Sequence, residues 1–166
     1  MLIQNGTIID GTGKPRYKAD IRVERDKIKG IGKFTLQKKE RLIDAEGRFV
    51  APGFIDIINR SDIHFSLFER GGSRSLLKQG VTTVLGGSCG TSLAPIINAD
   101  SIRPIQKWEN MSKLNINWSG TKEFLDEIER HHPSINFATL TGYATLRRGL
   151  LGDSFGEMDP ESIKKV

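Results

Sequence analysis

Few side chains in this sequence can bind a transition metal or act as a nucleophile, since it holds one cysteine and three histidines. Cys89, in the glycine-rich stretch 86–90, is the clearest candidate, because a thiolate is a strong zinc ligand. A zinc site generally needs three or four protein ligands, and Cys89 alone supplies one. The alternative is a small buried residue beside a turn. A single thiol also excludes an intrachain disulfide.

The three histidines are better explained by structural roles than by ligation. His131 and His132 close a predicted helix, where an imidazolium interacts favourably with the helix dipole and the exposed carbonyls. His64 lies four residues beyond Arg60, in the segment that follows a predicted strand, and could approach a site at the end of that strand. No catalytic residue is assigned from these patterns.

The stretch 51–62 predicts a buried strand that ends at a site, because Pro-Gly opens an apolar run and polar residues close it. Alternate residues near a strand end point to one side, so Ile58 and Arg60 would share a face. Neither can bind a metal ion, since isoleucine has no lone pair and arginine is permanently cationic. We expect Asp56 to satisfy backbone donors, and an exposed Asp62 to pair with Arg60.

The sequence has two parts that differ in their pattern of apolar and polar residues. Residues 1–50 read as short strands and tight turns, with a hairpin at Asn5-Gly6, and predict a small antiparallel sheet with one apolar face. From residue 51 the pattern becomes strands separated by helices. The expected strands are 52–58, 81–85 and 135–140, the expected helices are 73–79, 121–131 and one that begins at Asp159, and 142–147 is an expected loop.

Length and charge limit the classes of function. The chain of 166 residues is too short for a complete (β/α)8 barrel, which needs about 250 residues. The net charge of +5 comes from residues 1–50, where basic and acidic residues are interleaved rather than clustered with aromatics, which argues against nucleic-acid binding. Without a signal peptide or an apolar run of membrane-spanning length, we expect a cytoplasmic protein with no membrane partner.

A series of short motifs resembles one family. In order, these are Asn5 to Gly11, Pro52 to Asp56, Gly80 to Thr83, Ser88 to Pro95 and Gly142 to Arg147. The series resembles the N-terminal third of the N-acyl-D-amino-acid deacylases of the amidohydrolase superfamily. The resemblance implies an α/β fold in which residues 1–50 form an antiparallel β-sheet, part of a β-sandwich. Residues 51–166 would form the first three strands of an incomplete (β/α)8 barrel.

The resemblance also implies chemistry. In the family a metal-activated water attacks the amide carbonyl, and zinc is held by a cysteine that matches Cys89 together with histidines from later strands. A His-x-His pair serves a second, weaker site, and this sequence has Ile58 and Arg60 at those positions. A family histidine after the third strand is replaced by Tyr143. We therefore expect Cys89 to be the one inherited metal ligand, and no zinc bound by this chain alone.

Three hypotheses follow. The first is a truncated, degenerate amidohydrolase-like protein that does not hydrolyse amide C–N bonds by itself, because the His-x-His pair and the later strands are missing. The second is one subunit of a split amidohydrolase, completed by a partner chain that brings the later barrel strands. The third is a non-catalytic homo-oligomer that serves as a scaffold or regulator. The acyl group and side chain of any substrate are not determined by these residues.

Overall fold

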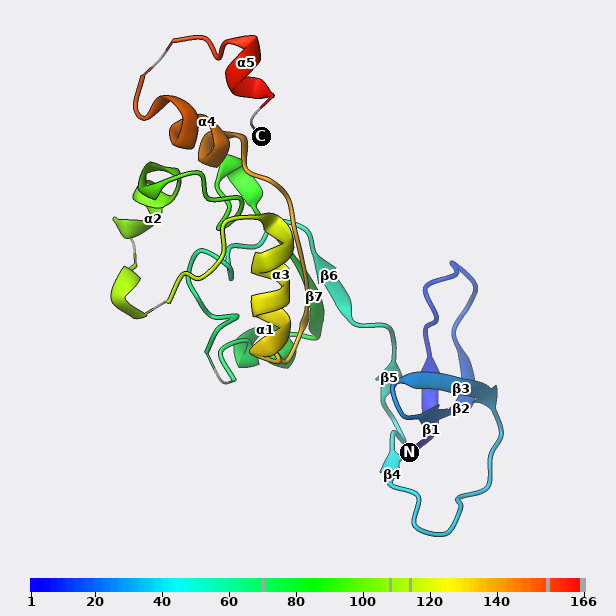
Figure 1. The fold of residues 1–166 in the computed structure, drawn as a ribbon. Helices are drawn as coiled ribbons and strands as arrows, with labels where there is room; N and C mark the ends of the chain where they lie inside the picture. The colour runs from blue at the N-terminus through cyan, green and yellow to red at the C-terminus, as the bar shows by residue number, and fades with distance from the viewer. Residues whose placement is uncertain (70, 108, 114, 155, 165–166) are drawn as a thin grey trace. The chain divides into compact units, whose positions relative to one another are not determined.

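The computed structural model describes residues 1–69, 71–107, 109–113, 115–154 and 156–164 (Figure 1). These form two compact units, Met1–Pro52 and Gly53–Val166. The second unit holds the residues that could do chemistry. None of the helices in the described residues is both long and apolar enough to span a membrane.

The first unit is a five-stranded sheet of mixed direction. Its strands are β1 (Leu2–Ile8), β2 (Tyr17–Glu24), β3 (Lys27–Gly32), β4 (Leu42–Asp44) and β5 (Phe49–Val50). Strands β1, β2 and β3 pair antiparallel, whereas β4 and β5 both pair parallel to β1. The prediction of a purely antiparallel sheet was therefore wrong. The chain crosses from β3 to the far edge of β1 before β4 begins, and that crossover makes the last two pairings parallel.

The predicted hairpin at Asn5-Gly6 was also wrong, because β1 runs straight through these two residues. The pairing of β1 with β2 shifts register between Ile3 and Gly6, which is a β-bulge. Asn5 has a φ of 62° there, and its side-chain amide donates to Asp44 at 3.0 Å. The tolerance of asparagine for positive φ thus serves a bulge instead of a turn.

The second unit is built on a three-stranded parallel sheet in the order β6-β7-β8. Its strands are β6 (Phe54–Asp56), β7 (Val81–Gly86) and β8 (Asn136–Thr139). The helices are α1 (Arg74–Lys78), α2 (Arg103–Gln106), α3 (Thr121–Arg130), α4 (Tyr143–Leu151) and α5 (Pro160–Ile163), with short 3-10 turns η1 (Ser88–Gly90), η2 (Ala99–Ile102) and η3 (Met111–Lys113). The helix predicted at Asp159 is confirmed, with its side chain accepting from Ser162 N at 2.9 Å.

The core of this unit lies between α3 and the strands β7 and β8. Phe124 of α3 is fully buried and meets the ring of Phe137 of β8 at 5.9 Å between centroids. The indole of Trp118 packs on Phe124 and donates to Leu93 O at 2.7 Å. Val84, at the centre of β7, completes this contact region as a fully buried side chain. The middle and last strands are thereby fixed in place.

Strand β6 is not buried as the sequence predicted. Phe54 and Ile55 point to opposite faces of the sheet, and both are about two-thirds exposed (67% and 65%). The core cluster includes residues of β7 and β8 but none of β6, which is an edge strand of the sheet. The apolar side chains of β6 therefore remain largely uncovered by the described residues, although the Phe54 ring lies over Gly80.

Candidate functional site

The candidate site is the edge of the second sheet where its parallel strands end. Strands β6, β7 and β8 finish at Asp56, Gly86 and Thr139. In open parallel sheets, ligands bind at this carboxyl edge, in loops that follow the strands. Arg60 and Cys89 lie in the first two of these following segments, and Tyr143 opens α4 after the third.

Asp56 has a structural role at the end of β6, as predicted. Its Oδ1 accepts from the backbone N–H of Ile58 at 3.1 Å, and its Oδ2 accepts from the side-chain amide of Asn59 at 2.7 Å. Asn59 is itself buried, and its Oδ1 accepts from Ser61 N at 2.8 Å. These bonds fix the backbone as it leaves the strand, so Asp56 is occupied and is not poised as a base.

Asp62 is buried, which contradicts the prediction of an exposed side chain. It is 1% exposed, and its Oδ2 accepts from the backbone N–H of Gly87 at 3.0 Å. Arg60, two residues earlier, is exposed, and the described residues contain no ion pair between the two. Alternation in a strand does not apply here, because residues 61–68 form a series of turns. Burial raises the pKa of the Asp62 carboxyl, with hydrogen bonds from backbone N–H groups opposing the rise.

The loops after β7 and β8 approach each other too closely for a side chain to fit between them. Gly87 has a φ of +74°, and a Cβ there would lie 2.1 Å from the carbonyl oxygen of Leu140. Further on, a Cβ on Gly142 would lie 2.4 Å from the carbonyl oxygen of Gly90. The glycines of both loops are therefore required by close backbone approach.

A buried pair of hydroxyl residues locks the same two loops. Thr145 Oγ1 accepts from the backbone N–H of Ser92 at 2.9 Å and donates to the carbonyl of Ser92 at 3.1 Å. The hydroxyl of Ser92 accepts from the backbone N–H of Gly142 at 2.9 Å. Both residues lie in motifs noted in the sequence, but no structural role could be predicted for them, since a serine or threonine hydroxyl does not by itself indicate its partner. The predicted loop 142–147 is in fact the start of α4, anchored by this pair.

Cys89 is carried on this rigid frame with its thiol exposed. The residue has a φ of 58°, in the left-handed region, within η1 directly after β7. The alternative of a small buried residue beside the turn is therefore wrong. Its role as a metal ligand stays a prediction, because ligation depends on partners that would have to meet it at this edge.

The histidines do not converge on Cys89. His64 Nδ1 lies 2.9 Å from Glu109 Oε1 in an exposed pair. His131 is the C-cap residue of α3, with its Nε2 3.2 Å from Glu127 Oε1. Within the described ranges, no three His, Cys, Asp or Glu side chains group in a way that could hold a metal ion. The residues present therefore do not fit a complete zinc site.

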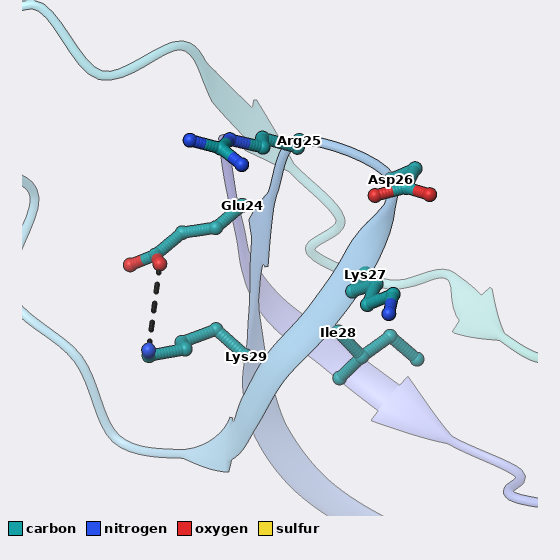
Figure 2. A pocket seen from close by; sticks show the side chains of 6 residues that line it. All are labelled: Glu24, Arg25, Asp26, Lys27, Ile28 and Lys29. Carbon is teal, nitrogen blue, oxygen red and sulfur yellow. Dashed lines mark ion pairs between the residues drawn. The ribbon is translucent and has the colours of Figure 1, made fainter.

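A hollow in the first unit was considered as an alternative site. It lies at the turn between β2 and β3 and is lined by the six residues 24–29 (Figure 2). The ion pair across it, between Lys29 Nζ and Glu24 Oε2 at 3.6 Å, is more than half exposed on both sides. The hollow lacks buried polar groups, so it offers no defined chemistry.

Comparison with curated proteins finds several relatives, among them deacylases from Alcaligenes xylosoxydans xylosoxydans. The chain is 33% identical over 153 residues to a D-aminoacylase, covering 92% of this chain and 31% of that protein. It is 34% identical over 153 residues to an N-acyl-D-glutamate deacylase, covering 92% of this chain and 30% of the relative. The chain thus spans about a third of the length of these relatives. No family model matches the chain.

Comparison with solved structures also finds D-aminoacylases and an N-acyl-D-glutamate deacylase. A crystal structure of D-aminoacylase, described as defining a novel subset of amidohydrolases, aligns with a TM-score of 0.83 and 32% identity over 98% of this chain and 34% of that one. N-acyl-D-glutamate deacylase from Bordetella bronchiseptica, solved with zinc and a phosphonate mimic of the tetrahedral intermediate, aligns at 0.79 with 30% identity, over 98% and 33%. A further D-aminoacylase structure, with a TM-score of 0.81, concerns a binuclear metal centre in which one metal activates and the second attenuates.

Proposed function

Because this chain is related over nearly its whole length to the N-terminal part of the N-acyl-D-amino-acid deacylases, with the His-x-His motif lost, we propose that it supplies the beginning of an amidohydrolase-type site. In this proposal, residues 51–166 are the first three strands of a (β/α)8 barrel. The carboxyl edge of β6-β7-β8 is then the floor of the active site. Alone, the chain does not hydrolyse amide bonds.

One observation carries this proposal: an exposed thiol stands on a rigid frame at that edge, without a complete set of metal ligands around it. Cys89 would supply a single thiolate to a zinc ion, whereas Ile58 and Arg60 would supply nothing. Zinc bound at such a site would activate water for attack on an amide carbonyl. Since the described residues do not form that site, no hydrolytic step is assigned to them.

For residues 1–50 we propose a role as one sheet of a β-sandwich. Four isoleucines lie opposite one another across the sheet, because Ile3 pairs with Ile21 and Ile43, and Ile21 pairs with Ile31. Directly paired residues share a face. Ile31 and Ile43 at the ends of this row are exposed. An apolar face of this kind is normally covered by a second sheet.

We propose that a second polypeptide supplies later barrel strands, so that the chain acts as one subunit of a split enzyme. The exposed apolar residues of β6 support this, because an edge strand with both faces uncovered is normally paired or covered. Self-association into a homo-oligomeric scaffold would cover the same residues. Sedimentation separates the two, since a scaffold would associate without any partner.

The test of activity uses the purified chain with zinc and a panel of N-acyl-D-amino acids. Release of the D-amino acid by the wild-type chain should equal release by a Cys89→Ala variant, at low and at high protein concentration. Release should rise only when a polypeptide carrying later strands of a relative is added. Turnover by the chain alone, above the Cys89→Ala control, would contradict the proposal.

A further inference from the structure

We propose that Arg60 makes the end of β6 a binding site for a carboxylate joined to an apolar group. The inference rests on the proposed function only for the idea that this edge is the functional one. The positive charge of the proposed site comes from Arg60, and its apolar part comes from exposed isoleucine and leucine side chains.

The backbone that carries Arg60 is fixed on both sides. The preceding residue, Asn59, is buried and bonded to Asp56, and its N–H lies 3.4 Å from Leu85 O of β7. The carbonyl of Arg60 accepts from the backbone N–H of His64 at 3.1 Å. The backbone at the base of the Arg60 side chain is therefore already ordered, so an anion that binds the guanidinium has only the side chain left to order.

The charge of Arg60 is not neutralised by its neighbours in sequence. Both oxygens of Asp56 accept hydrogen bonds from Ile58 and Asn59, and the Asp62 carboxylate is buried against Gly87. The next acid that approaches this segment, Glu109, pairs with His64. Among the ion pairs of the described residues, none involves Arg60. The guanidinium is therefore available to an external anion.

Exposed apolar residues lie close to Arg60 in the chain. Ile57 and Ile58, three and two residues before it, are 64% and 73% exposed. Across the end of β7, the backbone N–H of Leu140 donates to Gly86 O, next to the Leu85 carbonyl that faces Asn59. Residues 58–60 and Leu140 thus lie beside the carboxyl end of β7, on its two opposite sides. Leu140 is half exposed. The edge thus carries an exposed cation in the same segment as two exposed isoleucines, with an exposed leucine on the other side of β7.

This combination favours one ligand chemistry. A guanidinium offers two parallel N–H donors that match the two oxygens of a carboxylate, and a neutral amide cannot reproduce the charge. Exposed isoleucine and leucine side chains gain from contact with an apolar chain but not from a small hydrophilic anion. A monocarboxylate with a hydrocarbon tail satisfies both requirements.

The experiment is a titration of the isolated chain, followed by the arginine Nε–Hε signals in nuclear magnetic resonance. Hexanoate tests the proposal, hexanamide removes the charge and acetate removes the tail. We expect hexanoate to bind in the millimolar range and to shift the Arg60 signal. Arg60→Gln should weaken binding by up to about fivefold, the upper range of one exposed ion pair. Arg25→Gln, in the exposed turn between β2 and β3, is the matched control and should change nothing.

Several results would overturn the proposal. Equal binding of hexanamide, or unchanged hexanoate binding by Arg60→Gln, would show that the cation is not used. Equal binding of acetate would show that the apolar residues do not contribute. Because the titration needs neither zinc nor a partner, it can fail while the proposed function stands, and the activity assay can fail while the titration succeeds.

Discussion

Asp62 Oδ2 accepts a hydrogen bond from the backbone N–H of Gly87 at 3.0 Å, which ties the segment after β6 to the end of β7. The other carboxylate oxygen, Oδ1, is buried and has no hydrogen-bond partner among the described residues. Asp62 is therefore both a structural link and a buried charge that is only half satisfied, so the edge should be sensitive to its protonation.

Changing Asp62 should reveal that sensitivity as a pH dependence of stability. The pKa of this carboxyl is raised by burial, so the folded protein holds the proton more tightly than the unfolded chain. Its contribution to stability is full below the ordinary pKa of 3.8 and is lost as pH rises through the raised value. Asp62→Asn keeps an acceptor for Gly87 without the charge.

Urea denaturation of the wild type and Asp62→Asn across the acid to neutral range measures this effect. The free energy of unfolding of the wild type should fall relative to that of the variant as pH rises. A difference between the two proteins that does not change with pH would contradict this role of Asp62. Asp62→Ala, which leaves the Gly87 N–H unpaired, should cost about 1–3 kcal/mol.

Replacing Gly87 should damage the edge more than replacing another left-handed glycine in the same unit. Gly87→Ala combines an unfavourable φ with a Cβ placed 2.1 Å from Leu140 O. Gly71→Ala has a similar φ of +78°, but its Cβ would meet only the Arg74 side chain at 3.8 Å. We expect about 1–2 kcal/mol for the control and clearly more for Gly87→Ala. Thermal unfolding checks the order, and equal losses would exclude the backbone contact as the cause.

The Thr145 hydroxyl should account for much of the link between the loops after β7 and β8. Thr145→Val keeps the volume but leaves the buried N–H and C=O of Ser92 without their partner, at a cost of about 1–3 kcal/mol. Thr145→Ser keeps the hydroxyl and is the matched variant. Chemical denaturation should rank the proteins as wild type, then Ser, then Val. A Val variant as stable as the Ser variant would remove the proposed link.

A metal-binding pair should be restorable at the end of β6. The double variant Ile58→His, Arg60→His removes the cation and places two imidazoles at alternate positions. The thermal midpoint should then rise with the logarithm of the zinc concentration once the site is largely occupied, because a ligand that binds only the folded state stabilises it. Ile58→Ala, Arg60→Ala is the control. No zinc-dependent gain over that control would show that these positions do not converge.

The features that could be predicted from the sequence are those set by interactions between residues close together in the chain. Helix α3 follows from the spacing of Phe124, Leu125 and Ile128, and the N-cap at Asp159 follows from its side-chain chemistry. The prediction failed where a local signal has two structural uses. Asn5-Gly6 favours positive φ, which suits a hairpin turn and a bulge equally, and only the pairing of β1 with β4 and β5 decides between them.

The candidate site was predicted only in part for a similar reason. The exclusion of Ile58 and Arg60 as metal ligands needs side-chain chemistry alone, so it could be made from the sequence. The burial of Asp62 and the locking of Ser92 by Thr145 depend on contacts 25 and 53 residues apart in the chain. No periodicity within a single element signals such contacts.

We propose that this chain brings one metal ligand, Cys89, to an edge that the described residues do not complete as a metal centre. Equilibrium dialysis against zinc, followed by metal analysis of the wild type and Cys89→Ala, tests this proposal. We predict that neither protein retains stoichiometric zinc and that the two retain the same amount. One tightly held zinc ion per wild-type chain, lost in Cys89→Ala, would contradict the claim.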